Sequence, residues 1–348
     1  MITGRFEPVS LSRAELDELL ARGWYRIGHV MITTDYLVSD GHLRSAVWTR
    51  LDLERHRFRS SLRKRMARNA RRFQARVGPL VIDPAHEELY ARYREMRGGN
   101  RADTLDEVLG GEAGRLLFDT REISVFSGDR LVAFSWFDLG ETSVQSLLGV
   151  YDPEHRRHGL GFYTLLLEIE HAAELGMRFH YSGYVLSGCP SMDYKADVGQ
   201  LDYLDPATRL WLREPPFEVQ GSPAAIQRHR LGEAAEALIR SGSSVLCALN
   251  AALQISALRE QLPRCAAEPI LLMCTSPDQE WGLLVTWEQE HGRYAIFNGV
   301  PVSLVLERDD EGEAAAEPQQ IHCFIVHERL ADCTSVDEVA FWVRYHLP

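Results

Sequence analysis

The sequence predicts a mixed α+β and α/β protein, in which a central sheet with packed helices is followed by a further α+β domain. Three observations lead to this prediction. Strand-like and helix-like apolar patterns alternate between Glu87 and Tyr184. The pair Pro215-Pro216 then interrupts the chain, and a second series of such patterns follows it. Apolar residues make up 45% of the 348 residues, an ordinary share for a chain long enough to form two or three domains.

The first clear element is a basic helix that begins near Ser60. Its apolar stripe at helical spacing consists of Leu62, Met66, Ala70 and Phe73. Ser60 or Ser61 can cap the first turn. Between Arg50 and Arg76 there are eleven basic and two acidic side chains, a local charge of +9.

A helix of this kind can dock through its stripe and present cations to a phosphate backbone. The residues expected to do so are Arg63, Arg65, Arg68 and Arg72. The alternative is a solvated helix whose charges pair with acids of the same protein.

The central region predicts a helix, three strands, a long helix and a fourth strand. These elements are expected at residues 87–96, 122–126, 130–139, 143–151, 159–175 and 178–184. Short turns at Ser127-Gly128-Asp129 and Gly140-Glu141 make the first three strands antiparallel neighbours. This order resembles that of the GNAT acyltransferase core.

The turn before the long helix reads Arg156-Arg157-His158-Gly159-Leu160-Gly161 and fits the GNAT loop pattern Arg-x-x-Gly-x-Gly. Glycines let the backbone approach an anion, and the free N–H groups at a helix start bind phosphate. The predicted donor-binding residues are therefore Arg156, Arg157, Gly159 and Gly161. Their ligand would be the pyrophosphate of an acyl-CoA or the acceptor end of a tRNA, and a plain glycine-rich helix cap is the structural alternative.

Lysine is rare in this chain: of 38 basic residues only Lys64 and Lys195 are lysines. Lys195 ends the segment Gly183 to Lys195, which follows an apolar strand-like run. In a chain that otherwise uses arginine, a retained lysine indicates a site that needs a compact, titratable ammonium. An ordinary surface lysine is the alternative.

The same segment resembles the signature of the aminoacyl-tRNA–protein transferases, the arginyl and leucyl transferases of N-degron pathways. The matching positions are Tyr181, Gly183, Tyr184, Gly188, Cys189, Pro190, Met192, Tyr194 and Lys195. The basic run also matches the family, through Phe58, Ser61, Arg65, Arg68 and Asn69. So do Tyr151-Asp152-Pro153 and Gly159-Leu160-Gly161. The resemblance implies a GNAT-like core, a charged tRNA as donor and acyl transfer to an amine.

Two departures identify the chain as a divergent member of that family. Ser191 stands where the family has a lysine. The family's N-terminal cysteine cluster is missing, because Ile32 to Asp40 contain no cysteine and the first one is Cys189. No thiolate-bound metal is therefore expected there, and the acceptor stays open because the cluster region adjoins the acceptor site in the family.

Transfer from an activated ester to an amine needs a positioned amine, a stabilised oxyanion and the movement of one proton. The predicted catalytic residues are Tyr184, Asp193, Tyr194 and Lys195. The tyrosines and the lysine are expected to orient the aminoacyl group or to protonate the leaving oxygen, and Asp193 or Asp152 could accept the amine proton. Backbone N–H groups near Gly149 and Val150 are candidate oxyanion donors. A packed thiol is favoured over a nucleophile at Cys189.

The expected domains are an N-terminal region with the basic helix at residues 1–78, a GNAT-like core at 79–215 and an acidic α+β domain at 216–348. From Glu218 onward the chain has nineteen acids and nine arginines, a charge of −10, within a net charge of −12 for the whole chain. Helices are expected there at residues 233–240, 244–258 and 335–346, and strands at 270–274, 282–287, 294–297, 302–306 and 322–326. Residues 309–320 are expected to form a mobile acidic loop.

The sequence therefore predicts a tRNA-dependent aminoacyltransferase that acts on an amine of a protein, peptide or small molecule. Its partners would be charged tRNA and that acceptor, without a membrane, DNA, metal or further cofactor. Two alternatives remain: an N-acyltransferase that uses acyl-CoA, and an inactive RNA- or peptide-binding module. The local charge of +9 around the basic helix favours tRNA over acyl-CoA as the donor. Six cysteines without a metal-type or disulfide spacing, and the lack of a long apolar stretch, predict a cytoplasmic protein.

Overall fold

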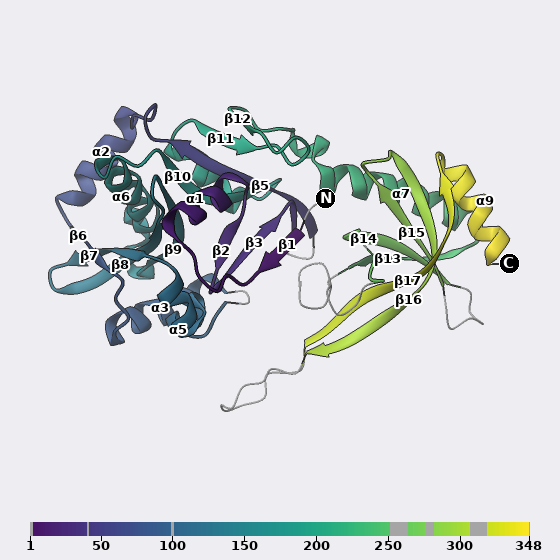
Figure 1. Ribbon diagram of the computed structural model, residues 1–348, viewed down its shortest axis with the longest axis horizontal. Coiled ribbons are helices and arrows are strands. Elements are labelled where there is room, and N and C mark those ends of the chain that lie inside the picture. Colours follow the sequence, from purple (N-terminus) through teal and green to yellow (C-terminus); the bar gives the residue numbers. More distant parts are fainter. Residues whose placement is uncertain are drawn as a thin grey trace. The chain divides into compact units, whose positions relative to one another are not determined.

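The computed structural model describes residues 3–39, 42–98, 101–250, 264–266, 268–275, 282–306 and 319–347. The chain forms two compact units (Figure 1). The core unit consists of Ile2–Thr34 and Ala46–Pro216, and the C-terminal unit combines Asp35–Ser45 with Phe217–Pro348. The basic helix and the predicted central elements thus belong to one unit. No helix in the described part of the chain is long and apolar enough to cross a membrane.

The core unit is built on a long sheet with the strand order β12-β11-β5-β10-β9-β8-β7-β6. Its strands are β5 (His42–Asp52), β6 (Gln74–Pro79), β7 (Thr120–Ser127), β8 (Arg130–Leu139), β9 (Ser143–Tyr151), β10 (Phe179–Leu186), β11 (Leu201–Leu204) and β12 (Trp211–Leu212). All neighbours on this path are antiparallel except β9 and β10, which are parallel. A small sheet joins β1 (Thr3–Phe6), β3 (Val30–Thr34) and β2 (Tyr25–Ile27).

The helices of this unit are α1 (Arg13–Ala21), α2 (Ser60–Ala70), α3 (Pro84–Arg97), α4 (Leu105–Leu109), α5 (Gly111–Leu117) and α6 (Leu160–Glu174). Two 3₁₀ segments, η1 (Pro153–His158) and η2 (Pro190–Val198), follow β9 and β10. The mixed α+β class and the predicted order of central elements are confirmed: β8 and β9 have the expected bounds, and α6 lies within the expected long helix.

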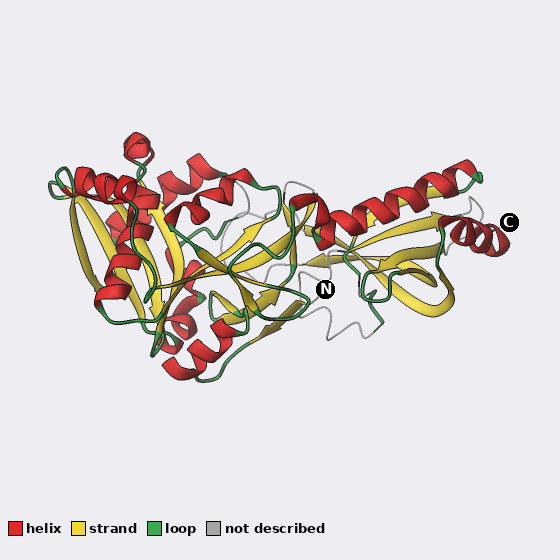
Figure 2. Cartoon of the chain, turned by 90° about the horizontal axis from the view of Figure 1, so that it is seen from above, coloured by secondary structure: helices red, strands yellow, loops and turns green. Residues whose placement is uncertain are grey.

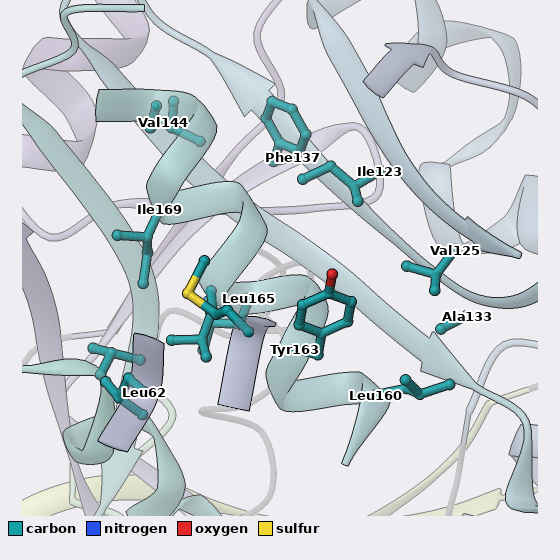
Figure 3. Packing of buried hydrophobic residues seen from close by; sticks show 14 of the residues in the cluster. Leu62, Ile123, Val125, Ala133, Phe137, Val144, Leu160, Tyr163, Leu165 and Ile169 are labelled. Atoms are coloured by element: carbon teal, nitrogen blue, oxygen red, sulfur yellow. The ribbon is translucent and has the colours of Figure 1, made fainter. Parts of the chain in front are cut away.

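Helix α6 packs on the sheet through an apolar face. Its buried side chains pack with strand residues from β7 and β8, and Leu62 of α2 joins the same cluster (Figure 3). The members shown there include Leu62, Ile123, Val125, Phe137, Leu160, Tyr163, Leu165 and Ile169. Burial of such side chains is the main contribution that holds the helix on the sheet.

The structure corrects two details of the basic helix. Leu62, Met66 and Phe73 are buried as predicted, but Ala70 is exposed and Asn69 is buried in its place. The helix begins at Ser60, so its N-cap is Arg59, which makes no side-chain cap bond. Asn69 donates from Nδ2 to the carbonyl of His158 at 3.2 Å, and this polar contact explains why an amide occupies the buried position.

The C-terminal unit is an antiparallel sheet with the order β13-β14-β15-β16-β17. Its elements are β13 (Ser244–Leu249), β14 (Ile270–Thr275), β15 (Gly282–Glu288), β16 (Arg293–Leu306), β17 (Gln319–Cys333), η3 (Val219–Gly221), α7 (Pro223–Arg240) and α9 (Val336–His346). Figure 2 distinguishes its helices in red from its strands in yellow. A hairpin of β4 (Tyr36–Ser39) with the first residues of β5 completes the unit.

Two C-terminal predictions are wrong. Residues 244–249 form a strand rather than the start of a helix, because they pair along their whole length with β14. The two strands expected at 294–297 and 302–306 are one strand, β16, which continues through Gly299 with an irregularity in its register. The remaining residues of the expected helix, 251–258, lie outside the described residues, as do 309–318 of the acidic loop.

Candidate active site

A cavity of about 510 Å³ opens where β9 and β10 diverge. The two strands pair only from Ser143 with Phe179 to Gln145 with Tyr181. Directly beyond this point Gly183 adopts a φ of +85°, and the pairing of β10 with β5 shifts its register. Glycine is suited to this position, because left-handed backbone strains other residues. The divergence leaves room between the two strands for a substrate, and residues of both strands line the walls.

Lys195 lies in the cavity wall and is held by the backbone. It extends from η2 and donates from Nζ to the carbonyl of Tyr184 at 2.9 Å. The ammonium is 5.6 Å from the centre of the Tyr184 ring. Burial lowers the pKa of Lys195 to about 8. Lys195 therefore remains mostly protonated at neutral pH but can give up its proton more easily than an exposed lysine.

Tyr184 and Tyr194 line the same cavity. The Tyr184 ring meets Trp48 edge to face at 5.2 Å, and the Tyr194 ring meets Phe162 in the same way at 6.2 Å. Loss of solvation raises the pKa of both phenols. Both hydroxyls are thus available as hydrogen-bond donors over the neutral pH range.

The structure brings together three of the four predicted catalytic residues, Tyr184, Tyr194 and Lys195. The side chain of the fourth, Asp193, lies outside the described residues. Asp152 is not among the cavity-lining residues. It is buried, accepts from the Glu154 amide at 3.0 Å and forms ion pairs with two arginines, which gives it a structural role.

The glycine loop forms one rim of the cavity. Gly159 has a φ of +62° and leads into α6 without a side-chain cap, so the first amides of this 15-residue helix keep free N–H groups. A Cβ at Gly161 would lie 2.9 Å from Cδ1 of Tyr151, so the chain can approach that ring only as glycine. Arg156, Gly159 and Gly161 line the cavity. Arg157 is exposed and donates to His158 at 3.2 Å.

The basic helix α2 lies beside this loop. The guanidinium of Arg65 is 5.1 Å from the ring centre of Phe162, and its Nη2 is 2.9 Å from where a Cβ on Gly159 would stand. Burial, and after it the charges of Arg157, Arg72 and Arg68 among others, lower the pKa of His158. Arg65, Arg68 and Arg72 are therefore neighbours of the loop.

Arg63 instead donates to the carbonyl of Phe58 at 2.7 Å, within the turn that precedes the helix. In the described part of the chain, Arg63, Arg65 and Arg68 make no ion pair with a carboxylate. The alternative of a helix neutralised by the protein's own acids is thus not supported for these three.

The sequence reasoning missed a buried polar chain at the cavity. Glu168 of α6 and Ser182 of β10 both line it, and His180 bridges them. His180 Nε2 is 3.3 Å from Glu168 Oε2, and Ser182 Oγ is 3.2 Å from His180 Nδ1. The available signal was a carboxylate on the apolar face of the long helix. Within the described residues, no group of three or more His, Cys, Asp or Glu is arranged to hold a metal ion.

The chain is similar to known proteins over part of its length. Residues 85–205 match the model of a family described as "Arginine-tRNA-protein transferase, C terminus". A protein of Chromohalobacter salexigens named aspartate/glutamate leucyltransferase is 30% identical over 179 residues, which are 50% of this chain and 71% of that protein. One of the same name from Leptospira interrogans is 29% identical over 139 residues, 38% of this chain and 54% of that protein.

The chain spans about half the length of that Leptospira relative. Among solved structures, a tandem GNAT protein from the clavulanic acid biosynthesis pathway aligns with 57% of this chain and 58% of its own, at 14% identity and a TM-score of 0.32.

Proposed function

Because this chain belongs to the aminoacyl-tRNA–protein transferase family, we propose that it transfers an amino acid from a charged tRNA to a primary amine of an acceptor protein or peptide. The observation that carries the proposal is the cavity between β9 and β10. A half-buried lysine, two tyrosines and a glycine loop line it, and an arginine helix lies at its rim. The names of the relatives make leucine the first donor amino acid to test, and N-terminal Asp or Glu the first acceptors.

The arginines of α2 and the start of α6 would bind the acceptor end of the tRNA. Arg65 reaches Gly159, and the charges of Arg68 and of Arg72, just past the helix end, act on the adjacent His158, so cationic side chains and free helix N–H groups are concentrated at one end of the cavity. Phosphate groups of an RNA strand are the ligand for such a surface. The aminoacyl ester would then extend into the cavity, toward Lys195.

Within the cavity the acceptor nitrogen attacks the carbonyl carbon of the ester. The new C–N bond forms, the C–O bond to the terminal ribose breaks, and the nitrogen loses one proton, which restores the charged form of Lys195 after that residue has protonated the leaving oxygen. Lys195 donates a proton to the leaving ribose oxygen, and Tyr184 and Tyr194 hydrogen-bond the reacting group. The ester is already activated, so the reaction needs no covalent intermediate on the enzyme.

A second candidate is an N-acyltransferase that uses acyl-CoA. The loop with Arg156, Gly159 and Gly161 at the cavity rim favours it, since this geometry also suits a pyrophosphate. It gives no role to the uncompensated arginines of α2.

The deciding experiment incubates the purified protein with radiolabelled leucyl-tRNA and peptides that begin with Asp, Glu or Ala. The proposal expects label in the Asp or Glu peptides and little in the Ala peptide. Acetyl-CoA with the same peptides is the parallel arm. Acetyl transfer without transfer from leucyl-, arginyl- or any other aminoacyl-tRNA would replace the proposal with the second candidate. No transfer from either donor class, with tRNA binding retained, would indicate an inactive binding module.

A further inference from the structure

The cavity contains a buried carboxylate for which the proposed chemistry has so far no role. Glu168 lies on α6 and is only 1% exposed, yet it lines the cavity. A carboxylate at such a position is costly to bury unless a cation or several hydrogen bonds compensate it. The groups around Glu168 therefore indicate which kind of ligand can compensate its carboxylate.

Two buried side chains form a hydrogen-bonded chain that ends at Glu168. His180 is fully buried and Ser182 is 4% exposed, and they form the chain Ser182–His180–Glu168. A neutral imidazole satisfies both contacts, because it accepts the serine hydroxyl at Nδ1 and donates from Nε2 to the carboxylate. In this arrangement one negative charge remains at the cavity wall. Of the described residues, no lysine or arginine forms an ion pair with Glu168; the ammonium of Lys195 is bonded to the Tyr184 carbonyl.

Aromatic side chains line the same cavity as this carboxylate. Tyr25, Tyr184 and Tyr194 all line the cavity. Burial first, and then the negative charge of Glu168, raise the pKa of Tyr25, and that charge also contributes at Tyr194, so the carboxylate lies within electrostatic reach of both phenols. The Tyr25 hydroxyl itself donates to the carbonyl of Ser146. A carboxylate among aromatic rings is a suitable site for a small cation, since ring faces attract ammonium groups.

We propose that Glu168 binds the α-ammonium group of an aminoacyl residue in this cavity, with His180 and Ser182 as positioning residues. This inference rests on the proposed function, because that reaction brings two such groups to the site. One is the α-ammonium of the aminoacyl donor, and the other is the N-terminal ammonium of the acceptor. In the second case Glu168 also accepts one proton from the ammonium, and the nitrogen lone pair then attacks the ester. In both cases a substrate with a blocked amine is rejected at this site.

Binding measurements with stable analogues test the inference. The donor probe is adenosine with a leucylamino group at the ribose 3′ position, where an amide replaces the ester, and its N-acetyl derivative is the control ligand. The acceptor probe is a peptide beginning with Asp, with and without N-acetylation. Calorimetry with the wild-type protein is expected to show at least a tenfold preference for the free amine in one of the two arms.

The variants are Glu168→Gln and Glu168→Asp, with Glu170→Gln as the matched control, because Glu170 is on the same helix but exposed. Glu168→Gln is expected to remove the preference for the free amine, Glu168→Asp to keep part of it, and Glu170→Gln to leave it unchanged. Loss in the nucleoside arm assigns the site to the donor, and loss in the peptide arm assigns it to the acceptor.

A wild-type protein that binds free and acetylated probes equally well would overturn the inference, and this comparison does not depend on the folding of any variant. A preference that survives in folded Glu168→Gln would overturn it too. If the wild-type protein transfers an amino acid to peptides and yet shows no preference, only the inference fails. If it neither transfers an amino acid nor binds the probes, the proposed function fails as well.

Discussion

Lys195 carries a half-buried ammonium whose hydrogen-bond partner is a neutral backbone carbonyl. Burial lowers its pKa from 10.5 to about 8, so the folded state disfavours the charged form. This is a cost in folding free energy that a purely structural residue would not need. The position is therefore one where stability and function are expected to conflict.

Lys195→Met is expected to raise the free energy of unfolding at pH 7 by about 1–2 kcal/mol, the cost of the buried charge less the lost hydrogen bond to Tyr184. Between pH 8 and 10.5 the wild-type folded state releases its proton before the unfolded state does, so wild-type stability rises with pH relative to the variant. The difference in unfolding free energy between the variant and the wild type should therefore shrink over that range. Urea unfolding of both proteins from pH 6 to 10 measures it, and a gap that does not depend on pH would contradict the assignment.

The same lysine predicts a pH profile for transfer. If Lys195 protonates the leaving oxygen, kcat should fall as pH rises through about 8, and Lys195→Met should lower kcat by about 10²–10⁴-fold with a smaller change in KM. Rates with leucyl-tRNA corrected for its own hydrolysis give both numbers. A variant with near wild-type kcat would remove Lys195 from the proton transfer.

The sequence predicted the part of the site that is local in the chain. Tyr184, Tyr194 and Lys195 lie within one signature, so recognising the segment placed all three. Glu168 and His180 are twelve positions apart on two different elements, and each alone looks like a polar residue in an apolar pattern. Only the packing of α6 against β10 reveals that they contact one another. Their contact was thus not accessible to reasoning on spacing.

Among the elements, α2 combines an apolar stripe with arginines beside the glycine loop. Tight association with tRNA should therefore depend on salt. Replacing Arg63, Arg65, Arg68 and Arg72 with Ala should lower the slope of log K against log salt by about 3, because each phosphate contact contributes roughly 0.7–0.9. Fluorescence titration of tRNA from low to moderate salt measures this slope.

The matched comparison uses two arginines at a time. Arg65→Ala with Arg68→Ala should lower the slope by about 1.5. Arg240→Ala with Arg344→Ala, two exposed arginines on α7 and α9, should leave it unchanged. Equal losses in the two double variants would mean that positive charge in general, rather than α2, binds the RNA.

Element prediction succeeded where pattern and pairing agree. Strands β8 and β9 were predicted to the residue, since the tight turns at Gly128 and Gly140 mark where β8 begins and where it gives way to β9. It failed at Ser244–Leu249, where Val245, Leu246, Ala248 and Leu249 suit the face of a helix as well as a strand. Pairing with β14 decides between the two, and pairing is not visible in a local window.

At the scale of the whole molecule, strand β5 belongs to both units. Its residues up to Ser45 are part of the C-terminal unit, and those from Ala46 are part of the core unit. Tyr36 and Leu43 are 3% and 1% exposed, and they pack in one cluster with side chains of α7, β15 and α9. A composition change at Pro215 indicated where the second series of elements starts, but nothing in the sequence indicated that residues 35–45 join it.

This arrangement predicts that two leucines on one strand act on different units. Leu43→Ala should destabilise the C-terminal unit, and Leu51→Ala, equally buried at 1%, should destabilise the core unit, each by about 2–5 kcal/mol. Hydrogen exchange read by mass spectrometry should show faster exchange in peptides of β14 and β15 for the first variant and of β8 and β9 for the second. Identical exchange patterns would show that the units unfold as one.

The placement of Tyr36 and Leu43 also has a consequence for synthesis on the ribosome. The partners of these two side chains in the C-terminal unit begin at α7, nearly two hundred residues later in the chain. At a translation rate of roughly 5–20 residues per second, on the order of 10–40 s pass between synthesis of the hairpin and emergence of the first of those partners. During that interval Tyr36 and Leu43 lack the α7 and α9 side chains that cover them in the folded protein, so the packing around them can be completed only late in synthesis.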